Sequence, residues 1–118
     1  MLEIDSLREY ALAKKGVTEG FPFDTTTLVL KVGGKMFLLI SMEENPCSIS
    51  VKTDPEWSAT LRETHTQITG AYHMNKTHWN SVYCQGIPPE LVHRLIDHSY
   101  ELVLGGLPKK LRKELEQD

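Results

Sequence analysis

Residues 27–40, TLVLKVGGKMFLLI, predict a β-hairpin that begins an antiparallel sheet. Two sets of side chains alternate along the first six residues: Leu28, Leu30 and Val32 against Thr27, Val29 and Lys31. This period of two is typical of a β-strand with one apolar face. Gly33-Gly34 then predicts a two-residue hairpin turn, because glycine tolerates the positive φ angles that such turns require. Met36 to Ile40 is continuously apolar, which predicts a central strand or one shielded on both faces.

A third strand follows this hairpin. Glu44-Asn45-Pro46 predicts a turn. After it, apolar and polar residues alternate again: Cys47, Ile49 and Val51 against Ser48, Ser50 and Lys52. The three predicted strands form an antiparallel meander.

Helices and two further strands surround the meander. Apolar residues at helical spacing from Ile4 to Ala11 predict a first helix, and residues 17–24 predict a loop. Thr53-Asp54-Pro55-Glu56 is typical of a helix start, with Asp54 or Thr53 as the N-cap. Two short strands are then expected over residues 68–72 and 79–84. Residues 91–103 predict a long amphipathic helix.

Together these elements predict an α+β fold in two layers, with helices on one face of an antiparallel sheet. The expected order is α-β-β-β-α-β-β-α plus a short C-terminal helix around Leu107, Leu111 and Leu115. Residues 1–118 form a single predicted domain, since a chain of this length buries one core without disulfides or metal.

Composition narrows the possible functions. The net charge is −3 and the pI is about 5.9, which argues against a strongly basic, non-specific nucleic-acid binder. Cys47 and Cys84 lie far apart and form no CxxC pair, so each is expected to act as a small buried hydrophobe. With no secretory signal and no apolar run of membrane-spanning length, we expect a reduced, cytoplasmic protein without membrane contact, as a monomer.

The face of the sheet away from the helices is expected to be open. Six residues are predicted to point outward there, and none is a carboxylate: Thr27, Val29, Lys31, Ser48, Ser50 and Lys52. A polar, hydroxyl-rich and locally basic face accepts a phosphate backbone. A solvated sheet face protected by lysines explains the same pattern.

Residues 71–83, AYHMNKTHWNSVY, concentrate side chains that stack, donate and accept hydrogen bonds. Asn75 to His78 predicts a tight turn that exposes Lys76 and His78. Trp79 and one tyrosine are expected to anchor the core, with Asn75 and His73 bonding to the turn backbone.

Other kinds of site find little support. His93 and His98 are five residues apart on a helix and therefore face different sides, and the spacing of common zinc sites is missing. No GxSxG elbow or phosphate-binding GK[ST] loop occurs. Glu43 and Glu44 are neighbours in sequence only, because adjacent strand residues point to opposite faces. No metal and no cofactor are expected.

The stretch AYHMNKTHW, residues 71–79, resembles the signature of the bacterial MmcQ/YjbR family. The resemblance extends to residues 13–16, to 51–56 and to 95–100, in the right order and over nearly the whole chain. Lys15 stands where many members carry a proline before the glycine, which affects local loop geometry. Seven residues occupy the motif positions: Lys52, Tyr72, His73, Asn75, Lys76, His78 and Trp79.

This resemblance implies a small α+β fold shared with secretion chaperones and frataxin-like domains. It also implies DNA binding, a function ascribed to the family because its sheet is similar to the double-wing saddle of a phage transcription factor. No enzymatic chemistry is attached to the motif residues, so we expect no catalysis.

The leading functional hypothesis is therefore a DNA-binding protein that contacts double-stranded DNA through the open sheet face and the Asn75–His78 turn. Phosphates would meet Lys31, Lys52 and Lys76. One alternative is a protein- or peptide-binding module that uses the sheet or its edge. A second alternative is a small-ligand site around His73, His78 and Tyr83, which predicts a concave pocket and a histidine with a shifted pKa.

Overall fold

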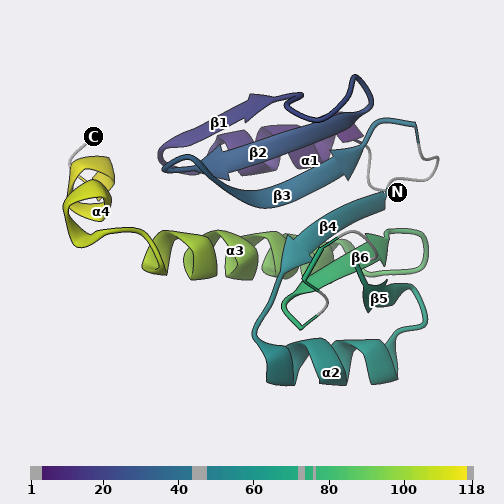
Figure 1. Ribbon diagram of the computed structural model, residues 1–118. Coiled ribbons are helices and arrows are strands. Elements are labelled where there is room, and N and C mark those ends of the chain that lie inside the picture. The colour runs from purple at the N-terminus through teal and green to yellow at the C-terminus, as the bar shows by residue number, and fades with distance from the viewer. Residues whose placement is uncertain (1–3, 44–47, 72–73, 76, 117–118) are drawn as a thin grey trace.

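The structure is a computed structural model that describes residues 4–43, 48–71, 74–75 and 77–116. The chain forms, in sequence order, α1 (Ile4–Leu12), β1 (Val17–Gly20), β2 (Thr27–Val32), β3 (Lys35–Ser41), β4 (Ser48–Lys52), α2 (Pro55–Thr64), β5 (Ile68–Gly70), β6 (Trp79–Tyr83), α3 (Pro89–Gly105) and α4 (Lys109–Glu116). The strands pair in the order β1-β2-β3-β4-β6-β5, antiparallel throughout. Figure 1 shows α3 running along the middle of the sheet, with β1–β3 on one side of it and β5, β6 and α2 on the other. The predicted α+β, two-layer fold is confirmed.

Local sequence signals account for two of the sharpest element boundaries, the β2–β3 hairpin and the start of α2. Gly33 and Gly34 have φ angles of 59° and 82°, so the hairpin between β2 and β3 uses positive φ at both positions, as predicted. Asp54 caps α2, because its side chain accepts a hydrogen bond from the Glu56 backbone N–H at 2.9 Å. Pro55 then occupies the first turn of that helix.

Strand β1 is absent from the predicted order, in which residues 17–24 form a loop. Its four residues contain only one apolar side chain, Val17, so no alternation marks them as a strand. Tertiary contacts form it instead: Val17 pairs with Val32, and Arg8 of α1 bonds to the Glu19 carboxylate with two nitrogens. The sheet therefore has one strand more than the sequence predicted.

The core lies between the sheet and the helices. Its strand residues are nearly inaccessible: Leu28, Leu30, Val32, Phe37, Leu38, Ile40, Ile49, Val51, Ile68 and Val82. Those of β2 and β4 are the ones that the alternation predicted to face inward. A β-bulge shifts the register of β3 after the Leu30–Leu38 pair and inserts Phe37 as the extra residue. Phe37 and Leu38 are both fully buried, and the Phe37 ring meets Tyr100 of α3 edge-on at 5.3 Å. This explains the continuous apolar run that the sequence showed in this strand.

Ser99 of α3 joins β3 to β4 where their pairing ends. Its hydroxyl donates to the Phe37 carbonyl at 2.5 Å and accepts from the Lys52 backbone N–H at 2.9 Å. The last direct pair between these strands is Leu38 with Val51. A buried helix side chain thus replaces the next step of the β-ladder and fixes α3 to the centre of the sheet.

Candidate functional site

The face of the sheet opposite the helices carries mostly hydroxyl groups. Strand pairing places Thr27, Ser41, Ser48 and Tyr83 in one row across β2, β3, β4 and β6. A second row contains Val29, Leu39, Ser50, Ser81 and Thr69. Tyr83 is 50% exposed at the end of β6. We call this surface the open face.

Val29 does not meet solvent as the sequence predicted, since its side chain is only 1% exposed. It lies in a hollow of about 340 Å³ that we call the Phe21 hollow, lined by Thr18, Glu19, Gly20, Phe21, Pro22, Val29 and Lys31. Strand β1 and the loop after it cover Val29, and neither cover was expected because both lay in the predicted loop. Lys31 borders the hollow and stays partly exposed.

Glu19 is the only carboxylate that lines the Phe21 hollow, and it is paired. Its two oxygens accept hydrogen bonds from Arg8 at 2.5 Å each. The hydrogen bond from Arg8 lowers the pKa of Glu19, so this carboxyl stays ionised and balanced by the guanidinium. The positive charge of Lys31 is therefore not cancelled within the hollow.

Lys52 borders a different hollow from Lys31. This second hollow, of about 320 Å³, lies where β3 and β4 separate over the C-terminal end of α3, and it is lined by Lys35, Met36, Lys52, Leu102, Val103 and Gly106. Lys35, which the sequence did not single out, joins Lys52 there. The two predicted phosphate contacts thus lie at separate parts of the sheet.

The predicted turn at Asn75 to His78 is present in the described residues. The Asn75 side chain accepts from the Thr77 backbone N–H at 2.9 Å, and its carbonyl accepts from the Trp79 N–H at 2.8 Å. Asn75 is exposed and His78 is half-buried. The predicted contacts Tyr72, His73 and Lys76 lie outside the described residues.

Trp79 is 8% exposed at the start of β6, opposite Lys52 of β4. Most of its indole is therefore unavailable for stacking on a base, in agreement with an anchoring role. The next residue, Asn80, is 1% exposed and joins β6 to α2 and to the residues just before α2. Its amide nitrogen donates to Thr53 at 2.8 Å, and its oxygen accepts from Arg62 of α2 at 2.8 Å.

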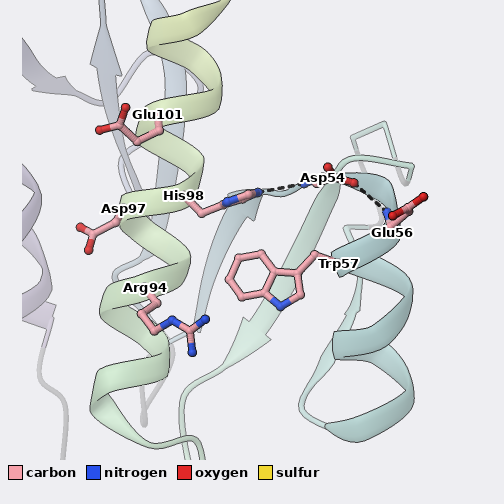
Figure 2. Close-up of a pocket in the computed structure, with 7 residues that line it drawn as sticks. All are labelled: Asp54, Glu56, Trp57, Arg94, Asp97, His98 and Glu101. Atoms are coloured by element: carbon pink, nitrogen blue, oxygen red, sulfur yellow. Dashed lines mark hydrogen bonds between the residues drawn. The ribbon is translucent and has the colours of Figure 1, made fainter.

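A cleft of about 550 Å³ separates α2 from α3, and sequence reasoning did not identify it. Figure 2 shows Trp57 of α2 facing Arg94 and His98 of α3 across this cleft. The remaining lining residues are acidic: Asp54, Glu56, Asp97 and Glu101. The cleft joins the segments 51–56 and 95–100, which the sequence had already marked as parts of the family resemblance.

His98 connects the two walls of the cleft. Its Nε2 accepts a hydrogen bond from the Asp54 backbone N–H at 3.1 Å, and its ring meets Trp57 edge-on at 4.7 Å. Burial lowers the pKa of His98, and the Asp54 carboxylate only partly opposes this. His98 is therefore neutral near pH 7. His93 instead stacks on Tyr10 of α1 at 4.1 Å, so the two histidines face different sides as predicted.

Asp97 turns away from Trp57 toward α1. It accepts hydrogen bonds from the Tyr10 hydroxyl at 2.7 Å and from the Lys14 ammonium. Although burial acts to raise it, these bonds hold the pKa of Asp97 below its usual value. Burial and the bond to Asp97 raise the pKa of Tyr10 to about 12. Asp97 and its two hydrogen bonds thus hold α1 against α3.

The small-ligand alternative predicted a concave site around His73, His78 and Tyr83. His73 lies outside the described residues, and Tyr83 is exposed on the open face. The cleft whose histidine has a shifted pKa is the one around His98. Within the described ranges, no three His, Cys, Asp or Glu side chains gather as a metal site requires. None of the described helices has the length and apolar character needed to cross a membrane.

Comparison with known proteins identifies the family. The family model described as YjbR matches residues 12–102. The chain belongs to the YjbR family. The match contains both the Phe21 hollow and the cleft between α2 and α3. The family resemblance seen in the sequence is thereby confirmed.

Its YjbR-family relatives cover nearly the whole chain. The chain is 33% identical over 117 residues to the protein YjbR of Escherichia coli K12, covering 98% of this chain and 99% of that protein. It is 36% identical over 112 residues to YbdF of Escherichia coli O157:H7, covering 94% and 92%. The crystal structure of Deinococcus radiodurans protein DR2400, with domain DUF419, superposes with a TM-score of 0.92 at 40% identity, covering 98% and 89%. A Pseudomonas syringae protein shares the fold, with a TM-score of 0.73 at 24% identity, covering 86% and 99%.

Proposed function

We propose that this YjbR-family protein binds nucleic acid through the open face of its sheet. The observation that carries the proposal is the distribution of charge. Among the residues of the six described strands, Glu19 is the only acid and is paired with Arg8. Lys31 and Lys52 alternate onto the open face, while Lys35 pairs with buried Val32 and lies on the side of the helices. The whole chain has a net charge of −3, so the sheet is basic within an acidic protein. A basic layer of this kind favours phosphate over carboxylate-rich partners.

The proposed contacts extend over both hollows and the turn. Lys31 and Lys52 would bond to phosphate oxygens, and the serine and threonine hydroxyls of the two open-face rows would donate to sugar or phosphate. The Thr53 backbone N–H donates to the His78 carbonyl at 2.7 Å, so the turn adjoins the end of β4. Exposed Asn75 would therefore extend the surface beyond Lys52.

Few lysines imply weak and moderately salt-dependent binding. Each phosphate contact contributes about 0.9 to the slope of log affinity against log salt for duplex DNA. If Lys31 and Lys52 are both used, raising salt from about 50 to about 200 mM lowers affinity by roughly 12-fold. A much steeper dependence would mean that other basic groups, outside the sheet, carry the binding.

Fluorescence anisotropy with labelled single-stranded and duplex DNA tests the proposal. Lys31→Glu and Lys52→Glu are each expected to weaken binding several-fold. Lys109→Glu is the matched control, because it makes the same charge change at an exposed residue of α4, which is not a strand of the sheet. No binding at about 100 µM protein in low salt, or an equal loss in the control, would overturn the proposal.

A protein or peptide partner is the second candidate. The observation that favours it is a set of large apolar side chains that are exposed on loops and strand ends: Phe21, Phe23, Met42 and Tyr83. Such side chains are common at protein contacts. A peptide-binding face predicts an affinity that salt scarcely changes and that nucleic acid does not compete for, which distinguishes the two candidates.

A further inference from the structure

The Phe21 hollow combines apolar side chains with one lysine at a single place on the open face. Val29 lies beneath the hollow and is only 1% exposed, whereas Phe21 beside it is 49% exposed. Pro22 adds a second apolar wall, and Lys31 places an ammonium group at the border. At about 340 Å³ the hollow is at the small end of the range of ligand sites.

These groups match the parts of one nucleotide. A planar base gains from contact with an exposed aromatic ring, and its phosphate gains from a lysine a few ångströms away. Glu19 does not repel that phosphate, because Arg8 neutralises it. A base inside a duplex is stacked on both sides and paired at its edge, so its face cannot reach an aromatic ring in a hollow.

We propose that the Phe21 hollow binds one unstacked nucleotide, so that the preferred ligand is single-stranded nucleic acid rather than a duplex. The base packs against Phe21 and Pro22, and the adjoining phosphate bonds to Lys31. This inference rests on the proposed function and specifies its ligand.

A second exposed ring lies on the same face at the other side of the sheet. Tyr83 of β6 is separated from β1 by four steps in the strand order. At ~4.8 Å for each step, Tyr83 lies roughly 19 Å from β1 across the sheet, and Phe21 directly follows β1 in the chain. A single nucleic-acid strand that crosses the two rows of the open face would thus meet an aromatic ring near each end. A binding site of at least about four nucleotides is therefore expected.

The test measures anisotropy of a labelled oligothymidylate of about 12 nucleotides, and of a duplex of the same length, with the intact protein. Phe21→Ala is expected to weaken single-strand binding by about tenfold while duplex binding stays unchanged. Phe21→Trp should keep the affinity, and its added indole fluorescence should be quenched by the oligonucleotide. Phe23→Ala is the matched control, because Phe23 is exposed on the same loop and does not line the hollow.

The possible outcomes separate this inference from the proposed function. Tighter binding of the duplex, or equal losses in Phe21→Ala and Phe23→Ala, would overturn the inference and leave the proposed function standing. Binding of neither DNA would overturn both. If free thymidine monophosphate displaces the oligonucleotide at equal nucleotide concentration, the ligand is a nucleotide and not a strand, and the inference is again wrong.

Discussion

Replacing Asn80 by alanine tests how strongly one buried amide joins α2 to the sheet. Asn80 is 1% exposed, and its oxygen accepts from the Arg62 guanidinium at 2.8 Å. Its amide nitrogen donates to the Thr53 hydroxyl at 2.8 Å and has longer contacts to Ser58 at 3.2 Å and the His78 carbonyl at 3.4 Å. All of these bonds disappear in Asn80→Ala.

The expected cost follows from the kinds of bonds lost. A hydrogen bond to a charged donor such as Arg62 contributes about 2 kcal/mol, and a neutral one about 1 kcal/mol. Thr53 and Ser58 still bond to each other, so the remaining hydroxyls are not left without a partner. We therefore expect Asn80→Ala to lower the free energy of unfolding by about 3 kcal/mol. For 118 residues this lowers Tm by roughly 12 °C.

Urea and thermal unfolding, followed by circular dichroism and tryptophan fluorescence, measure this loss. Asn80→Asp should cost less than Asn80→Ala, because a carboxylate keeps the bond from Arg62 and accepts from the Thr53 and Ser58 hydroxyls. Asn75→Ala is the control: Asn75 is an exposed turn residue with one side-chain bond to a backbone N–H, and less than about 1 kcal/mol is expected. A loss below about 1 kcal/mol for Asn80→Ala, or a larger loss for Asn80→Asp, would refute this account.

Three further predictions concern stability. Burial lowers the pKa of His98 from its usual 6.5, so as the pH falls this histidine takes up a proton in the unfolded chain before it does so in the folded one. The free energy of unfolding is therefore retained above about pH 6.5 and decreases below it. His98→Gln should reduce the difference between the urea midpoints measured at about pH 7.5 and about pH 5. Gly33→Ala should lower Tm more than Gly34→Ala. Both glycines have positive φ, but only a Cβ on Gly33 would contact Leu107, at 2.6 Å. Equal decreases in Tm would contradict this. Ser99→Ala should lower the free energy of unfolding in urea by about 2 kcal/mol, because the Phe37 carbonyl and the Lys52 backbone N–H both lose their hydrogen bond. A decrease under about 0.5 kcal/mol would show that the β3–β4 junction does not depend on Ser99.

Sequence reasoning predicted those elements whose signal is local. The Gly33-Gly34 hairpin, the helix start at residues 53–56 and the alternating strands all depend on residues within a few positions of one another, and all are present. Of the two predicted caps, Thr53 and Asp54, the structure uses Asp54. Strand β1 has no such signal, since its only apolar residue is Val17. It exists because β2 offers a free edge and α1 supplies Arg8.

The candidate sites were less predictable for a related reason. Lys31 and Lys52 were placed together on one face by alternation alone, yet they border different hollows. The cleft at His98 depends on a bond to Asp54, 44 positions away in the sequence. The hydrophobic periodicity within each helix does not predict which other helix it contacts when the two are 44 positions apart in the sequence.

The layer architecture, the hairpin, the helix start at residues 53–56 and the family could all be predicted from the amino-acid order, because each depends on side-chain identity along short stretches. The hollow that residues of β1 and its loop form beside Val29, and the cleft around His98 between α2 and α3, could be seen only in the folded chain. The physical reason is that alternation assigns a side chain to a face of its strand. Whether that face is open, hollowed or covered depends on segments that fold against it from elsewhere in the chain.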